Sequence, residues 1–289
     1  VTNSLRECFG VMNSMLPVGE NGKICAKDVV GWFTMGAAQV MKGITAFGVA
    51  TLVGEFLYAH HRNLPEFPDH DGNALFGRDD LPAVSVLAVG DSALTGPGLA
   101  SPDQIFLHRA LNDLATDHHI RLTSLAKGGS RTLDVIETQL PVAIAKSWDV
   151  VVLSCGVNDV MHGVPIRLVE RRLREIVDEL EKVAARVVLA GVGDVGTAPR
   201  APFPLSLGVT SLARATDRLH AKVMMDRPLV LKAPMWELTT ETFRSGGDLF
   251  VEDLFHPNAA GHEVWASAVR DTMRQAITEA VAHRQQSGQ

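Results

Sequence analysis

Short apolar runs alternate with longer amphipathic segments from residue 83 onward. Each run is nearly continuous in aliphatic residues, which is typical of a parallel strand covered by helices on both faces. The pattern predicts an α/β fold, a three-layer α/β/α sandwich with about five parallel strands. The expected strands are 84–89, 121–125, 150–154, 186–190 and 229–232, and the expected helices are 101–117, 133–146, 165–184, 209–225 and 258–283.

The first 82 residues follow a different pattern. Residues 1–28 are mixed in polarity and are expected to form a leader. Residues 29–59 carry Lys42 and Glu55 as their only charges and predict an apolar helix that exceeds the roughly 20 residues needed to cross a bilayer. Two interpretations stay open, a membrane anchor or a helix packed in or on the protein, and with them a membrane or envelope location or a cytoplasmic one.

Further boundaries follow from composition along the chain. Residues 60–82 contain Pro65, Pro68 and Pro82 together with several aspartates, which is typical of a linker. The main domain is expected over 83–284, and residues 285–289 are expected to be a disordered tail. A chain of 289 residues with 46% hydrophobic content can bury one substantial core.

Charge and cysteine content exclude several classes of protein. The net charge of −6 is spread along the chain without a basic stripe, which argues against nucleic-acid binding. The three cysteines, Cys8, Cys25 and Cys155, do not indicate a disulfide framework, although Cys8 and Cys25 could pair in an oxidising compartment. No Cys and His spacing typical of zinc is present, so neither a metal nor another cofactor is expected.

Polar residues follow three of the predicted strands. Ser92 lies in Gly90-Asp91-Ser92, Gly129 follows the second strand, and Asn158 follows the third. Because the carboxyl ends of parallel strands share one edge of a sheet, all three are expected to face one crevice. The backbone N–H groups of Ser92 and Gly129 and the amide of Asn158 would then form an oxyanion hole, with Gly128 as the alternative in another loop register.

A serine hydroxyl needs a base and a carboxylate to become a nucleophile. The imidazole accepts its proton, and the carboxylate holds the imidazole in one tautomer. Asp253 and His256 supply both types, separated by one short turn ahead of the last helix. Each residue alone also fits a structural role, Ser92 as a turn serine and Asp253 as a helix cap. His262 is expected to face away from the site.

Four blocks together resemble the SGNH, or GDSL, hydrolase superfamily of esterases, lipases and acyltransferases. The blocks are Gly90-Asp91-Ser92, Gly129, Gly156-x-Asn158-Asp159 and Asp253-x-x-His256-Pro257, which occur in that order. Gly156 to His162 is also similar to a subgroup of actinobacterial GDSL-type esterases that carry an amino-terminal hydrophobic segment. The resemblance implies flavodoxin-like strand order, Ser92, Asp253 and His256 as catalytic residues, and Ser92, Gly129 and Asn158 as oxyanion donors.

The predicted activity is hydrolysis of a carboxylic ester through an acyl-enzyme on Ser92. An acyltransferase or a carbohydrate deacetylase would use the same intermediate, and a non-catalytic binding module on a flavodoxin-like scaffold is the alternative from another class. A small-molecule or lipid ester is the expected partner. The loop 196–208 is rich in Pro, Leu and Phe, and two interpretations stay open for it, an apolar rim of the crevice or a rigid packed connection.

Overall fold

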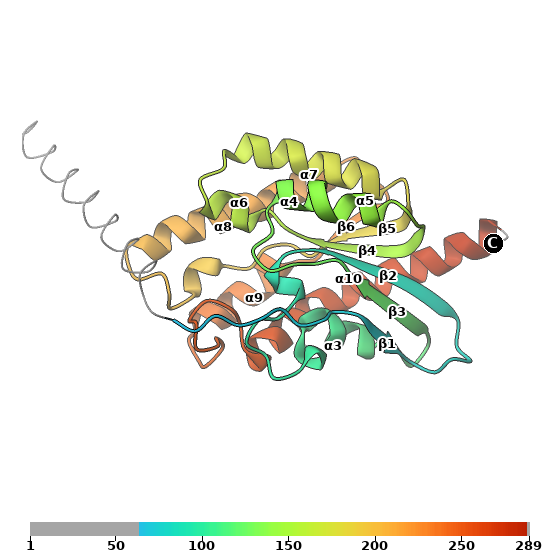
Figure 1. The fold of residues 1–289 in the computed structure, drawn as a ribbon, viewed down its shortest axis with the longest axis horizontal. Helices are drawn as coiled ribbons and strands as arrows, with labels where there is room; N and C mark the ends of the chain where they lie inside the picture. The colour runs from blue at the N-terminus through green and yellow to red at the C-terminus, as the bar shows by residue number, and fades with distance from the viewer. Residues whose placement is uncertain (1–63, 288–289) are drawn as a thin grey trace, which may run out of the picture. The chain divides into compact units, whose positions relative to one another are not determined.

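The computed structural model of the protein describes residues 64–287. A six-stranded sheet forms its centre, in the order β1-β3-β2-β4-β5-β6 (Figure 1). The strands β2 to β6 pair in parallel, and β1 runs antiparallel to β3 at one edge. The strands are β1 (Ala74–Phe76), β2 (Ala83–Gly90), β3 (His119–Ser124), β4 (Trp148–Ser154), β5 (Ala184–Leu189) and β6 (Val230–Lys232).

The five predicted strands are present, and their spatial order is the flavodoxin-like one. The prediction of a purely parallel sheet of about five strands is wrong, because β1 makes it a mixed sheet of six. This strand lies in segment 60–82, which the sequence predicts to be a linker. With three residues, β1 is too short to show an alternation of apolar and polar positions. Asn73, directly before it, helps to hold β1 beside β3 by accepting a hydrogen bond from the Ser124 N–H at 3.0 Å.

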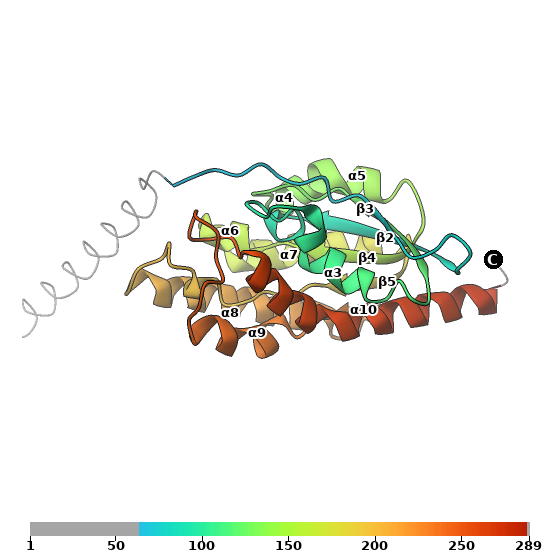
Figure 2. The same ribbon diagram turned by 90° about the horizontal axis from the view of Figure 1, so that it is seen from below.

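The helices cover both faces of this sheet. α3 and α10 pack on one face, and the segments from α4 to α8 pack on the other (Figures 1 and 2). The helices are α3 (Phe106–Asn112), α4 (Thr132–Asp134), α5 (Leu140–Ala143), α6 (Val157–Met161), α7 (Ile166–Leu180), α8 (Leu205–Met224), α9 (Met235–Arg244) and α10 (Ala259–Ser287). Shorter turns are η1 (Ser92–Leu94), η2 (Pro102–Gln104), the π-helical η3 (Val135–Gln139) and η4 (Val195–Thr197).

Alternation along the central strands explains the three layers. Val86 and Ala88 of β2 belong to the core on the side of α3 and α10, whereas Leu87 and Val89 belong to the core on the opposite face, where η3 and α5 contact β2. All four are at most 1% exposed. A strand with both faces buried needs aliphatic residues at every position, which is why the sequence shows continuous rather than alternating runs.

Several helix boundaries differ from the prediction. The expected helix 133–146 is divided into α4, η3 and α5, in a segment where Pro141 supplies no N–H donor. α9 is not among the predicted helices. α10 continues to Ser287, so the expected disordered tail is wrong for residues 285–287.

The remaining amino-terminal predictions fall on residues that the structure does not describe. The leader 1–28, the apolar helix 29–59 and residues 60–63 of the linker are among them, as are residues 288–289 of the tail. Between residues 64 and 287, no helix combines the length and the apolar character needed to cross a bilayer.

Candidate active site

Ser92 lies at the carboxyl edge of the sheet, where β2 turns sharply into η1. Gly90 makes this turn possible, because its φ is +142° and a Cβ there would lie 1.9 Å from the Ser154 carbonyl oxygen. Asp91 then caps η1, with its carboxylate accepting the Ala93 N–H at 3.1 Å. The strand therefore ends at a glycine for steric reasons, and Ser92 follows on an ordered turn.

The structure brings Ser92, His256 and Asp253 into one hydrogen-bonded chain. The Ser92 Oγ lies 3.1 Å from His256 Nε2, and His256 Nδ1 lies 2.6 Å from Asp253 Oδ2. A hydrogen on Nδ1 donates to the carboxylate, which leaves Nε2 to accept the serine proton. The arrangement has the connectivity of a serine nucleophile, its base and the group that orients the base.

A tight turn holds Asp253 and His256 together. The second carboxylate oxygen of Asp253 accepts the N–H groups of Phe255 at 2.8 Å and His256 at 2.9 Å. Leu254, between them, has a φ of +61°, a left-handed conformation that costs a non-glycine residue about 1–2 kcal/mol. Burial alone would raise the pKa of Asp253, but the hydrogen bonds from the His256 ring and from the N–H groups of His256 and Phe255 outweigh it and hold the pKa below its ordinary value.

The predicted oxyanion residues lie on two neighbouring loops. Asn158, in the first turn of α6, lines the same pocket as Ser92 and His256, and its amide donates to the Ser130 carbonyl at 3.1 Å. Gly129 is exposed, has a φ of +74°, and leaves open space where a side chain would stand. The amide of Asn158 thus connects its own loop to the loop that carries Gly129.

Two buried side chains brace these loops. Asp159 is fully buried and accepts the Thr132 N–H at 2.8 Å and the Thr132 hydroxyl at 2.6 Å. Gln139 is also buried and binds both backbone groups of Gly90 as well as the Ser130 hydroxyl. These hydrogen bonds make Asp159 an organiser of the turn, whereas nothing in the sequence around Gln139 indicates a link to the site.

Asp91 lies beneath Ser92 and is buried, at 3% exposure. Burial raises the pKa of its carboxyl group to about 6, although hydrogen bonds from the Ala93 N–H and the Ser154 hydroxyl act in the opposite direction. Its side chain joins the ends of β2 and β4 directly behind Ser92. These contacts give Asp91 a structural role at this turn.

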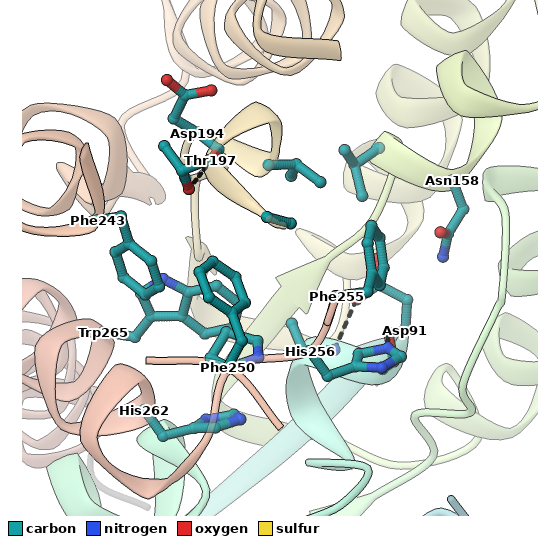
Figure 3. A pocket seen from close by; sticks show the side chains of 17 residues that line it. Asp91, Asn158, Asp194, Thr197, Phe243, Phe250, Phe255, His256, His262 and Trp265 are labelled. Carbon is teal, nitrogen blue, oxygen red and sulfur yellow. Dashed lines mark hydrogen bonds between the residues drawn. The ribbon is translucent and has the colours of Figure 1, made fainter. Parts of the chain in front are cut away.

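A small cavity opens beside Ser92 and His256, with a volume of about 80 Å³. Figure 3 shows Phe243, Phe250 and Trp265 grouped on one side of it, with His256 and Asn158 on the other. The lining residues are Asp91, Ser92, Ala93, Val157, Asn158, Gly193, Asp194, Val195, Thr197, Ala198, Phe243, Phe250, Phe255, His256, Pro257, His262 and Trp265.

His262 corrects the expectation that it faces away from the site. It lines the cavity, is 1% exposed, and its Nδ1 accepts the Phe106 N–H at 3.1 Å. Burial lowers the pKa of His262 to about 3, so its ring is neutral at physiological pH. The sequence interval of six residues from His256 was misleading, because α10 starts only at Ala259 and the turn before it is not helical.

The loop 196–208 fits the interpretation as an apolar rim only at its start, and its exposed apolar residues fit neither interpretation. Thr197 and Ala198 line the cavity, whereas Phe203 and Leu207 are 75% and 58% exposed and do not line it.

Over residues 64–287, no group of three or more His, Cys, Asp or Glu side chains is arranged to hold a metal ion.

The model of the GDSL-like lipase/acylhydrolase family matches residues 88–264. A GDSL-like esterase of Mycobacterium tuberculosis is 28% identical over 202 residues, which cover 68% of this chain. The matched region spans 63% of that relative's length.

Solved structures share the fold. A lipolytic protein of the G-D-S-L family from Veillonella parvula superimposes with a TM-score of 0.52 at 15% identity, covering 65% of this chain and 96% of that one. An acetyl-xylooligosaccharide esterase from Geobacillus gives a TM-score of 0.51 at 18% identity, covering 67% and 96%. The family match extends from β2 into α10 and includes Ser92, Gly129, Asn158, Asp253 and His256, and the chain belongs to the GDSL-like lipase/acylhydrolase family.

Proposed function

We propose that this protein is a serine ester hydrolase that works through an acyl-enzyme on Ser92. The observation that carries the proposal is the continuous hydrogen-bonded chain from the Ser92 hydroxyl through His256 to Asp253, at 3.1 Å and 2.6 Å. These three hydrogen-bonded side chains lie at the mouth of an apolar cavity at the carboxyl edge of the sheet. Membership of the acylhydrolase family supports the same activity.

In the first half-reaction, Ser92 Oγ attacks the carbonyl carbon of the ester while His256 Nε2 takes its proton. Asp253 accepts a hydrogen bond from Nδ1 and stabilises the imidazolium that forms. The tetrahedral intermediate then collapses, and the alcohol leaves with the proton from His256. Water attacks the acyl-enzyme by the same route in reverse, releases the acid and restores the Ser92 hydroxyl.

The negative oxygen of the intermediate requires preorganised donors. The N–H groups of Ser92 and Gly129 and the Asn158 amide are the proposed set. An amide nitrogen carries two hydrogens, so the bond from Asn158 to the Ser130 carbonyl leaves a second N–H for the substrate oxygen. Gln139 and Asp159 support these donors through Ser130 and Thr132, without touching the substrate themselves.

The test is hydrolysis of p-nitrophenyl butyrate by the full chain and by Ser92→Ala. We expect the variant to lose at least about 10³-fold in kcat, because no neighbouring group replaces the nucleophile. Ser267→Ala is the matched control, since its hydroxyl bonds within α10 at 2.7 Å from the Val264 carbonyl oxygen, and it should retain full activity. Unchanged turnover by Ser92→Ala would refute the proposal.

We also propose that the apolar segment 29–59 attaches the protein to a membrane. The support is its sequence, which is apolar over more residues than a bilayer span requires. Fractionation of cells that express the full chain and a chain starting at residue 63 tests it. Loss of membrane association in the shorter chain is the expected result, and equal distribution of both would contradict it.

A further inference from the structure

The cavity beside Ser92 has a chemical character that selects one part of the substrate. Phe243, Phe250 and Trp265 form its wall away from the nucleophile, and Val157 and Ala198 contribute apolar groups elsewhere. His262 completes the wall as a neutral ring, because its pKa is only about 3. Two carboxylates also line the cavity, but Asp91 accepts the Ser154 hydroxyl and Asp194 is paired with Arg244. The wall of rings between them is apolar and suits the hydrocarbon portion of an acyl group.

The size of the cavity limits that hydrocarbon. Its volume is about 80 Å³, roughly half of a ~150 Å³ protein cavity that accommodates benzene. By that comparison it accommodates about half of a benzene ring, which corresponds to two or three carbons beyond the ester carbonyl. Longer chains would have to displace the aromatic wall.

The aromatic wall is fixed in place by ring packing. Trp265 lies edge-on to Phe106 at 5.8 Å between ring centroids and against Phe243 at 6.2 Å. Phe243 in turn packs edge-on to Phe250 at 5.6 Å. Phe106 is 1% exposed and belongs to the core beneath α10. Trp265 therefore packs against a buried ring and cannot move away from the cavity in that direction.

An ion pair joins this wall to the opposite loop. Arg244, next to Phe243 on α9, donates to Asp194 Oδ2 through Nε at 3.0 Å and Nη2 at 2.7 Å. Asp194 also accepts the Gly196 N–H and the Thr210 hydroxyl, and therefore holds η4 at the cavity edge. The width between η4 and α9 is thus set by a buried carboxylate with four donors.

From these observations we infer that the enzyme is specific for esters of short acyl groups, about two to four carbons long, with Phe243 and Phe250 ending the acyl site. This inference rests on the proposed function. In an open acyl groove, each added CH2 would raise kcat/KM by about fourfold through burial. In this site we expect the gain in kcat/KM to stop once the acyl chain of the substrate reaches the aromatic wall.

The experiment measures kcat/KM of the full chain with p-nitrophenyl acetate, butyrate and octanoate. We expect acetate or butyrate to be best and octanoate to be at least about 10-fold worse than butyrate. Phe250→Ala should raise the octanoate-to-butyrate ratio by about 10-fold, and Phe243→Leu should raise it in the same direction. Phe203→Ala, which removes an exposed phenylalanine outside the cavity, is the matched control and should leave the ratio unchanged.

The outcomes separate the inference from the function on which it rests. Hydrolysis in which octanoate equals or exceeds butyrate overturns the short-chain specificity and leaves the esterase activity intact. A short-chain optimum that neither variant shifts overturns the assignment of Phe243 and Phe250 as the end of the site. Failure of folded protein to hydrolyse any of the three esters, with Ser92 unreactive toward a fluorophosphonate, overturns the proposed function and the inference with it.

Discussion

The side chain of Gln139 makes two hydrogen bonds to the backbone of Gly90, accepting its N–H at 2.8 Å and donating to its carbonyl at 2.9 Å. Gly90 is two residues before Ser92, the proposed nucleophile, and Gln139 ends the π-helical turn η3. Its amide also lies 3.2 Å from the Ser130 hydroxyl, on the loop beside Gly129. One buried side chain therefore links the end of β2 to the loop that carries a proposed oxyanion donor.

Replacement of Gln139 by methionine should lower kcat by about 10-fold while KM changes by less than about twofold, because the donors shift relative to the nucleophile. The loss of bonds to the buried Gly90 groups should also reduce the free energy of unfolding by about 1–3 kcal/mol. Gln275→Met is the control, since Gln275 bonds to Glu279 on the surface of α10. A fall in thermal stability with kcat unchanged in the folded enzyme would show that Gln139 is structural alone.

Asp91 predicts an unusual pH dependence of stability. Its pKa is raised by burial from 3.8 to about 6 in the folded state. The folded protein therefore holds this proton more tightly than the unfolded chain, and stability decreases as pH rises from about 4 to 6, then stays constant. The shift corresponds to about 3 kcal/mol.

The measurement compares urea unfolding of the wild type and Asp91→Asn at several pH values. Relative to the variant, the wild type should lose about 3 kcal/mol between pH 4 and pH 7. Asp253, whose lowered pKa gives the opposite trend, is present in both proteins and cancels in the difference. Parallel stability curves would contradict the buried, proton-retaining environment of Asp91.

The ion pair between Asp194 and Arg244 should contribute to stability even though Arg244 is half exposed. The Asp194 carboxylate is 1% exposed, so Arg244→Gln leaves a buried charge short of a partner and should cost about 1–2 kcal/mol of unfolding free energy. Arg274→Gln, in an exposed pair with Asp271, should change it by less than about 0.5 kcal/mol. Equal losses of unfolding free energy for Arg244→Gln and Arg274→Gln in denaturant titrations would show that the Asp194 pair contributes no more than an exposed pair.

Asn158 offers a direct test of the oxyanion site. Asn158→Ala removes an amide donor and should lower kcat by about 10²-fold, with a smaller effect on KM, because the donor acts mainly on the transition state. Steady-state kinetics with p-nitrophenyl butyrate measures this. A loss confined to KM would assign Asn158 to substrate binding instead.

Much of the architecture could be predicted, because strands buried on both faces leave continuous aliphatic runs such as those of β2 and β4. The residue types and order of Ser92, Asp253 and His256 predict that they come together, and the structure places them in one hydrogen-bonded chain, while their catalytic roles stay a prediction. The strand β1 was missed because three residues show no period. Gln139 and His262 were missed because their roles depend on tertiary contacts, with Gly90 and Ser130 in one case and Phe106 in the other.

The central claim is that Ser92 is the nucleophile and that His256 activates it. Peptide mapping by mass spectrometry after reaction with a fluorophosphonate tests this most directly, in the wild type and in His256→Ala. The account predicts one adduct per chain on Ser92, formed in parallel with loss of esterase activity, and slowed by at least about 10²-fold in His256→Ala. An adduct on another residue, or labelling of Ser92 that proceeds at the same rate without His256, would contradict it.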